Sequence, residues 1–276
     1  MITVSIVTFH TDLNELTQCL KALESRSISV IFIIDNSKDE AIRRFCFSKT
    51  NVEYIPQKNI GYGAAHNIAI RKSIALNADY HLVLNSDVYF SPDVINEIEN
   101  YMNLHPDVGQ LIPNTIYPND DIQYVVRLLP TPMILIFRRF LPKSWFQKQN
   151  DRFLLKDWKH DSILNVPFHM GCFMFFRNCS LEKTGGFDET FFMYMEDVDL
   201  TRRIHKSAKT IFWPKVTIVH NHKRESYKNR RLLKIHIKSA ISYFNKWGWF
   251  FDKERSEWNR EVLQDICSSA KSSVSR

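Results

Sequence analysis

The sequence lacks the features of a membrane-spanning or secreted protein. No apolar run approaches the roughly 20 residues that a helix needs to cross a bilayer. The longest candidate, residues 163–176, is interrupted by Asn165, Pro167 and His169. The first residues, MITVSIVTF, contain no basic region and no small-residue cleavage site, so they predict a strand and not a secretory signal. We therefore expect the protein in the cytosol.

Paired cysteines and the common phosphate-binding loops are also missing. The five cysteines are odd in number and show no C-x-x-C spacing, which argues against a disulfide framework and a zinc site. There is no G-x-G-x-x-G after the first predicted strand and no G-x-x-x-x-G-K-[ST] anywhere. The sequence thus supports neither a nicotinamide dinucleotide site nor a Walker-type loop.

Composition and charge describe a globular body with a basic tail. With 276 residues, 44% hydrophobic and 24% charged, the chain suffices for one large domain or two small ones. The formal charge of +7 lies entirely in residues 223–276, which hold 13 basic and 6 acidic residues. We expect an anionic partner for this tail and a neutral body that does not bind nucleic acid.

Short apolar runs alternate with helical patterns in the first third of the chain. Runs at 4–9, 29–34, 52–55 and 80–84 predict strands, with helices between them, which indicates βαβ units and an open parallel sheet. Ligands bind beyond the carboxyl ends of such strands. Asp35 and Asp87 follow the second and fourth runs, so two carboxylates are expected in one crevice. An Asx-turn or helix cap is the alternative for each.

Two further segments near this crevice suit a phosphorylated ligand and a cation. Residues 59–67, NIGYGAAHN, open a predicted helix with small residues, where free N–H groups favour anions. Asn85, Ser86 and Asp87 end the fourth strand, where an oxygen ligand suits a hard divalent cation that also binds substrate phosphates.

The middle of the chain gives a weaker pattern. Between 113 and 161 the periodicity fades, and the apolar, basic segment 133–141 predicts a mobile loop or short helix over the crevice, with a core helix as the alternative. Residues 166–176, VPFHMGCFMFF, predict a buried strand, in which Gly171 allows close approach to the backbone.

The acidic stretch 185–203, GGFDETFFMYMEDVDLTRR, combines carboxylates with an aromatic run. Glu196 and Asp197 start a predicted helix whose Val198, Leu200 and Ile204 face inward, with residues 201–203 pointing elsewhere. Aromatic surroundings can tune a carboxylate as a base. Stabilisation of acids by the helix dipole is the alternative.

Two histidines and a basic helix complete the pattern. A strand at 210–219 runs into His220 and His222, of which at most one faces the crevice because alternate residues point in opposite directions. From residue 227 a helix is predicted with Leu233, Ile237, Ala240, Ile241, Phe244 and Trp247 on one side and cations beside it. Such a helix either lies in a membrane interface or packs on the catalytic body.

Taken in order, the motifs VSIVTFH, IIDNS, NIGYGAAHN, LVLNSDV, GCFMFF, GGFDETFFMYMEDVDLTRR and His-x-His resemble those of the family 2 inverting glycosyltransferases, most closely the bacterial rhamnosyltransferase-like branch. The resemblance covers residues 2–227. It implies an α/β GT-A fold, an open, mostly parallel twisted sheet flanked by helices. Residues 1–226 would form this domain, with 113–162 an acceptor-side insertion, and 227–276 a basic amphipathic helical extension.

The resemblance also implies roles for individual residues. Asp197 would be the catalytic base, supported by Glu196, and Asp87 the metal-binding acid, with Asn85 in place of the first acid of the family's D-x-D motif. His220 would be the second metal ligand, with His222 in reserve. Gly171 and Cys172 would lie on the acceptor side. The implied nucleotide-sugar-binding residues are Thr8, His10, Asp35, Asn59, Gly61, Asn67, Asn85 and Ser86.

The implied activity is transfer of a sugar from a nucleotide-diphosphate donor, dTDP-rhamnose first, to a saccharide acceptor in surface polysaccharide synthesis, with Mg²⁺ or Mn²⁺ as cofactor. UDP-galactofuranose, UDP-galactose and UDP-glucose are the alternative donors. We expect a lipid-diphosphate-linked acceptor. We also expect contact with the anionic inner face of the bacterial inner membrane, and a homodimer. A nucleotidylyltransferase or a membrane adaptor is the competing class.

Overall fold

The computed structural model describes residues 1–25, 27–222 and 230–274. Within them the strands are β1 (Ile2–Thr8), β2 (Ile28–Asp35), β3 (Val52–Pro56), β4 (Tyr80–Leu84), β5 (Val88–Tyr89), β6 (Val108–Ile116), β7 (Leu164–Asn165), β8 (Phe173–Arg177) and β9 (Lys209–His220). The α-helices are α1 (Leu13–Ala22), α2 (Glu40–Phe47), α3 (Tyr62–Ala75), α4 (Asp93–Leu104), α5 (Pro132–Phe140), α6 (Gln147–Phe153), α7 (Asn178–Thr184), α8 (Glu196–His205), α9 (Arg230–Trp247) and α10 (Lys253–Val274), with a 3₁₀ turn, η1 (Lys143–Trp145).

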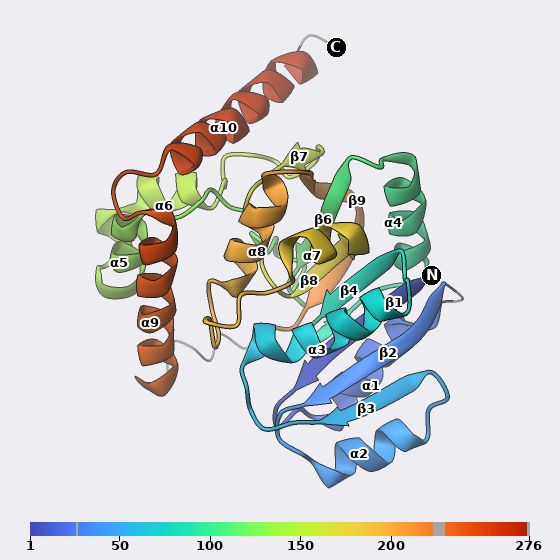
Figure 1. The fold of residues 1–276 in the computed structure, drawn as a ribbon. Coiled ribbons are helices and arrows are strands. Elements are labelled where there is room, and N and C mark those ends of the chain that lie inside the picture. The colour runs from blue at the N-terminus through green and yellow to red at the C-terminus, as the bar shows by residue number, and fades with distance from the viewer. Residues whose placement is uncertain (26, 223–229, 275–276) are drawn as a thin grey trace.

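The strands form one open sheet in the order β3-β2-β1-β4-β8-β6-β9-β5, with β7 paired to β9 (Figure 1). The pairs among β3, β2, β1 and β4 are parallel, as the βαβ pattern predicts. Strand β8 enters antiparallel between β4 and β6, and β6 and β9 are again parallel. The fold is therefore mixed α/β, with its parallel half built by the first third of the chain.

Strand β2 explains why these strands appear as continuous apolar runs. Its Ile31 and Ile33 join the core that contains α1 and α2, whereas Phe32 and Ile34 pack with Ala65 of α3 on the opposite face. Successive side chains of a strand point to opposite faces, so a strand covered by helices on both faces needs apolar residues at every position.

The strand predicted over 166–176 is wrong in its first half, because β8 begins only at Phe173. Pro167 has no N–H for a ladder. The preceding segment instead bonds to residues 125–127: Met170 N donates to Val125 O at 2.8 Å, and Arg127 N donates to Phe168 O at 3.3 Å. Apart from His169 this segment has no polar side chain, and it is largely buried, so composition alone could not separate it from a strand.

The segment 133–141 contains a short helix, α5, with Ile134 buried and Met133 and Ile136 exposed. This agrees with the short-helix prediction and not with a core helix. No described helix is both long enough and apolar enough to cross a membrane.

Helix α9 buries part of the predicted side, since Phe244 is buried and Ala240 and Trp247 pack on the core, together with part of a neighbouring side. Ser239, Tyr243 and Phe244 are buried, whereas Ile237 and Ile241 are exposed. The buried side contacts the acidic stretch and α8: Ser239 Oγ donates to Met193 O at 2.8 Å. The predicted domain boundary at 226/227 lies outside the described residues.

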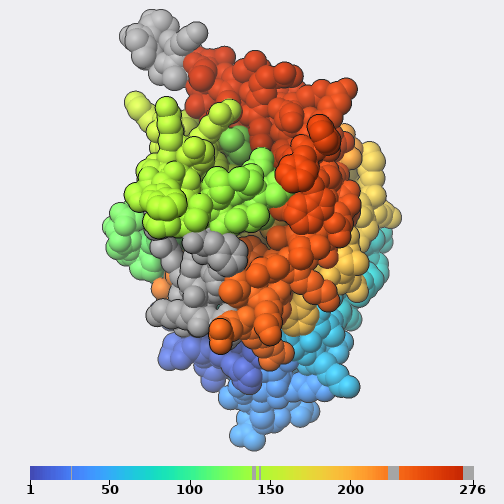
Figure 2. Space-filling model, turned by 90° about the vertical axis from the view of Figure 1, so that its left-hand side faces the viewer, coloured from blue at the N-terminus to red at the C-terminus, as the bar shows by residue number. Residues whose placement is uncertain are grey.

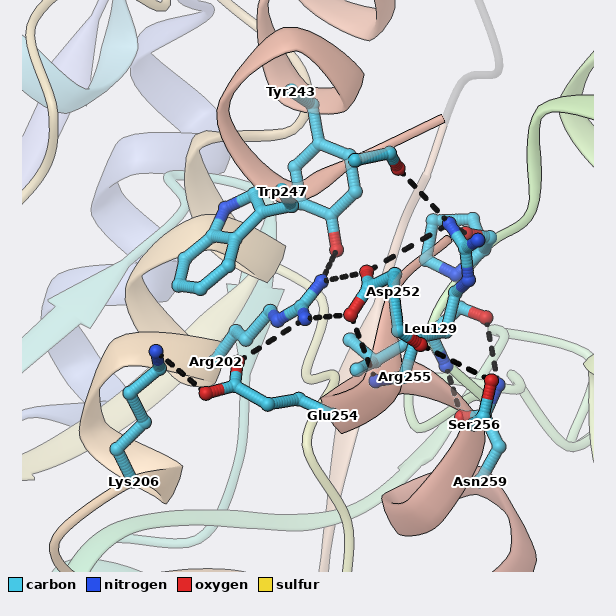
Figure 3. A network of polar contacts seen from close by, with 12 residues as sticks. Leu129, Arg202, Lys206, Tyr243, Trp247, Asp252, Glu254, Arg255, Ser256 and Asn259 are labelled. Carbon is cyan, nitrogen blue, oxygen red and sulfur yellow. Dashed lines mark hydrogen bonds and ion pairs between the residues drawn. The ribbon is translucent and has the colours of Figure 1, made fainter. Parts of the chain in front are cut away.

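A buried ion pair joins α8 to the turn between α9 and α10 (Figure 3). Arg202 of α8 is 1% exposed, and its guanidinium donates to both carboxylate oxygens of Asp252, at 2.6 and 2.7 Å. Tyr243 lies 3.2 Å away, and the ring of Trp247 covers the guanidinium at 4.0 Å. The prediction that residues 201–203 point away from the core is wrong for Arg202, whose charge this carboxylate from a distant segment satisfies. It is also wrong for Thr201, which is fully buried and accepts from Gln110 Nε2 at 3.1 Å.

Candidate active site

The acid pair begins α8 after two strained residues. Tyr194 and Met195 both have positive φ, 69° and 70°, a conformation that costs free energy for side chains of this size. This turn starts the helix at Glu196. Glu196 is buried, 5% exposed, while Asp197 keeps part of its surface exposed. Only Asp197 is therefore open to a substrate.

Backbone N–H groups fix the orientation of Asp197. Its Oδ2 accepts from Gly171 N at 3.0 Å and its Oδ1 from Val198 N at 2.8 Å. Each carboxylate oxygen keeps a free lone pair, which a substrate hydroxyl can use. The irregular backbone before β8 is what aims the Gly171 N–H at Asp197.

The two carboxyl groups differ in ionisation. Burial raises the pKa of Glu196 well above its ordinary value, and the charge of Asp197 raises it further. Burial also raises the pKa of Asp197, but the N–H groups of Val198 and Gly171 and the positive charge of Arg127 counter it. Two neighbouring acids whose environments separate their pKa values take different roles. Of the two groups, the surroundings therefore favour ionisation of Asp197 over ionisation of Glu196.

Tyr62, the first residue of α3, connects this base to the end of β4. Its hydroxyl donates to the carbonyl of Gly171 and lies 3.0 Å from Asn85 Oδ1. Asn85 N in turn donates to Cys172 O at 2.9 Å. The base, the predicted acceptor-side residues and the end of β4 thus belong to one hydrogen-bonded unit.

Asp87 and His220 form the candidate metal centre. His220 Nε2 lies 3.3 Å from Asp87 Oδ1, and its Nδ1 is 2.8 Å from Gln123 Oε1, an acceptor. With this orientation of the Gln123 amide, Nδ1 carries the proton, and in the neutral ring the Nε2 lone pair faces the carboxylate. A cation or a second proton would then fit between them, and metal-ligating histidines commonly donate their other N–H in this way.

The surroundings of His220 favour a positive charge on its ring. Although burial opposes it, the charges of Cys172 and Asp87 raise the pKa of His220 to about 10. Among the described residues there is no cluster of three or more His, Cys, Asp or Glu side chains placed to hold a metal. The residues present fit Mg²⁺ or Mn²⁺ bound by one carboxylate and one imidazole, with substrate phosphates and water completing the shell. His222 is exposed, and its ring lies 5.2 Å from the ring of His220.

The predicted nucleotide residues fall into a group at the end of β2 and a group at the start of α3. Asp35 is buried, and its oxygens accept from five groups at 2.6–3.2 Å, on Thr8, Ser37, Asp39 and Tyr54. Hydrogen bonds from Ser37 and Tyr54 hold its pKa below 3.8 in spite of burial. Asp35 therefore fixes the loop that follows β2, and His10 joins this loop through its N–H to Ser37 Oγ at 3.2 Å.

At the start of α3, Asn59 and Gly61 lie beside the acidic stretch. Asn59 is exposed and caps Gly61 N at 3.2 Å, and Gly61 has φ 97° with its α-carbon against Phe192 O. Asn67 is buried, and its amide bonds the backbone of Phe187 in both directions at 2.9 Å. It holds the acidic stretch on α3 and offers no free polar atom to a nucleotide. Ser86 is half-buried between Asn85 and Asp87.

Sequence reasoning missed Tyr62, Gln123 and Arg127. Tyr62 lies within the predicted helix start 59–67, where attention to a hydroxyl beside the glycines could have found it. Gln123 and Arg127 come from the stretch without periodicity, and no sequence signal marks them.

The fold and the acids beyond β2, β4 and the aromatic run define an α/β transferase of the GT-A type. Residues 3–185 match the family model described as glycosyl transferase family 2. The chain belongs to this family, and its similarities place it in the rhamnosyltransferase-like branch.

Two relatives and one solved structure illustrate this placement. The N-acetylglucosaminyl-diphospho-decaprenol L-rhamnosyltransferase of Mycobacterium tuberculosis is 27% identical over 75% of the chain and 70% of its own length. The rhamnosyltransferase WbbL of Escherichia coli K12 is 24% identical over 77% of the chain and 81% of its length. A mannosyltransferase from Pyrobaculum calidifontis, solved with GDP-Man and Mn²⁺, shares the fold at a TM-score of 0.55 and 16% identity, covering 99% of the chain and 75% of its own.

Proposed function

We propose that this protein transfers a sugar to a lipid-diphosphate-linked saccharide in bacterial surface polysaccharide synthesis, with inversion at the anomeric carbon. The first-choice donor is dTDP-rhamnose. The observation that carries the proposal is the hydrogen-bonded unit that joins Asp197, through Gly171 and Tyr62, to Asn85 at the end of β4. It holds a base and a candidate cation site on one edge of the sheet.

The residues divide the reaction between them. Asp197 accepts the proton of the acceptor hydroxyl as that oxygen attacks the anomeric carbon, and the N–H groups of Gly171 and Val198 keep the carboxylate aimed. Burial raises the pKa of Glu196 well above its ordinary value and so disfavours a second charge beside Asp197. A divalent cation held by Asp87 and His220 would stabilise the negative charge on the departing diphosphate. Attack opposite the leaving group in a single displacement inverts the sugar.

The choice of donor and acceptor rests on the relatives. Both curated relatives described above are rhamnosyltransferases, and the mycobacterial one is named for a decaprenol-diphosphate acceptor. UDP-galactofuranose, UDP-galactose and UDP-glucose are the next donors in our proposal. The nucleotide contacts are assigned to His10, Asn59, Gly61, Asn85 and Ser86, with buried Thr8 and Asp35 holding the loop that follows β2 and with Gly171 and Cys172 on the acceptor side.

Calorimetric titration with dTDP-, UDP- and GDP-sugars, each with Mn²⁺, Mg²⁺ or chelator, tests the donor site. We expect one nucleotide class to bind, more tightly with metal, and Asp87→Ala to lose the metal-dependent part. Metal-independent binding that is equal in Asp87→Ala would refute the assigned cation site. Failure of every donor to bind, with the acceptor analogue present as well, would refute the function.

A further inference from the structure

The turn between α9 and α10 exposes large aromatic side chains on a rigid support. Trp249, Phe250 and Phe251, the aromatic corner, are 37%, 75% and 97% exposed. Arg255, itself buried, donates to the carbonyls of Trp249 and Phe250 at 3.1 and 3.3 Å. The next residue, Asp252, turns inward to Arg202 (Figure 3). The acid is thus buried and the aromatic rings face solvent.

Helix α5 lies beside this corner. Arg255 Nη1 also donates to Pro130 O at 3.5 Å, and the side chain of Asn259 bonds both the N–H and the carbonyl of Leu129, just before α5 begins. Figure 2 shows the yellow-green α5 and α6 segment against the orange-red α9 and the corner on one face of the molecule. Met133 and Ile136 of α5 are half exposed, and Trp145 of η1 is 74% exposed.

Helices α9 and α5 add cations and no acids to this face, and the nearest acids of α10, Glu254 and Glu257, already pair with Arg202, Lys206 and Lys253. Helix α9 exposes Arg230, Lys234 and Lys238 along one stripe with Ile237 and Ile241. Neither α9 nor α5 contains a single Asp or Glu. Exposed aromatic and aliphatic groups beside lysines and arginines are the composition of a surface that enters a lipid interface and attracts anionic headgroups.

The charge distribution decides between a bilayer and a second copy of the chain. A two-fold interface through this face would set the cations of one α9 against those of the other, with no acid on α9 or α5 to compensate. An anionic lipid surface matches both the charge and the apolar groups.

We propose that the aromatic corner and the exposed side of α5 insert into the interfacial region of an anionic bilayer, with the cations of α9 on its headgroups. The inference deepens the proposed function and rests on it, because it places the enzyme on the surface that presents a lipid-linked acceptor. The Arg202–Asp252 pair then serves to present the corner outward.

Cosedimentation of the full chain with vesicles tests the inference, using phosphatidylcholine alone or with phosphatidylglycerol. We expect the wild type to bind the anionic vesicles. In the double variant Phe250→Ser, Phe251→Ser the partition coefficient should fall at least about tenfold, since each ring loses interfacial burial. Lys234→Gln should lower binding to the anionic vesicles about fivefold. The control Phe47→Ser, on α2, changes a ring that is 71% exposed and should leave partition unchanged.

Each outcome separates the inference from the proposed function. Wild-type protein that binds a nucleotide sugar but not anionic vesicles overturns the inference and leaves the function standing. Vesicle binding without any donor binding refutes the function and leaves the surface assignment standing. The inference is also overturned if the double variant, at equal thermal stability, partitions onto vesicles as the wild type does. It is overturned as well if the wild type forms a dimer in sedimentation analysis, does not bind vesicles, and the double variant is monomeric.

Discussion

Removing one partner of the buried Arg202–Asp252 pair should unfold the protein at markedly lower temperature. Arg202 is 1% exposed, and its guanidinium donates to both carboxylate oxygens of Asp252. In Asp252→Ala the guanidinium stays buried and loses its bidentate partner, keeping Tyr243, the ring of Trp247 and the partly exposed carboxylate of Glu254. A buried charge left without its partner costs about 3–5 kcal/mol. For a chain of this size that corresponds to a midpoint lower by about 10 °C.

Thermal unfolding followed by circular dichroism measures this effect against two comparisons. Lys253→Ala removes one end of an exposed pair, 3.7 Å from Glu257, and should change stability by less than about 0.5 kcal/mol. The double variant Arg202→Met, Asp252→Leu removes both charges and should regain most of the lost stability. A loss below about 1 kcal/mol in Asp252→Ala, or an equal loss in the double variant, would refute the unpaired-charge reasoning.

The same pair has a defined pH dependence. Although burial opposes it, the hydrogen bonds from Arg202 and Arg255 hold the pKa of Asp252 below 3.8. A carboxyl with a lowered pKa in the folded state contributes its stability above the unfolded value and loses it as pH falls through the folded one. The difference between wild type and Asp252→Ala should therefore persist at neutral pH and shrink only in acid below 3.8.

Three further predictions concern the site itself. Because burial raises the pKa of Asp197, which must be ionised to act as a base, kcat/KM should fall as pH drops through a value above 3.8, and a profile flat down to that pH would contradict its role. His220→Gln should weaken donor binding with Mn²⁺ at least about tenfold and leave binding in chelator unchanged, whereas an equal loss in both would indicate a structural role only. Gly61→Ala places Cβ 2.2 Å from Phe192 O at φ 97° and should lower the free energy of unfolding in urea by roughly 2–4 kcal/mol. Gly185→Ala, where nothing lies within 4 Å of the added Cβ, should lower it by about 1 kcal/mol. Similar losses in the two variants would contradict the steric argument.

The sequence predicts the parallel half of the sheet because local pattern and burial agree there. Strands buried on both faces appear as short apolar runs, and the acid that follows each run lies at the carboxyl edge, as Asp35 and Asp87 do. The acid pair at the start of α8 is likewise placed correctly. The fold and family follow from these motifs in order.

What the sequence could not predict depends on contacts between distant residues. Burial of Arg202 requires Asp252, fifty positions later, and helical periodicity contains no sign of that pairing. Gln123, which orients His220, comes from a stretch whose conformation is set by its bonds to the segment before β8. Ile237 points outward because of the way α9 docks on α8. The amphipathic pattern alone had placed Ile237 on the apolar side of the helix.

The most direct test of the account compares sugar transfer and donor binding in Asp197→Asn. Loss of a general base lowers turnover roughly 10²–10⁴-fold. We expect that loss with donor affinity unchanged, while Asp188→Asn, a carboxylate of the same acidic stretch that pairs with Lys246, keeps its activity. Retained transfer in Asp197→Asn, or donor affinity lost together with activity, would contradict the assignment of Asp197 as the base.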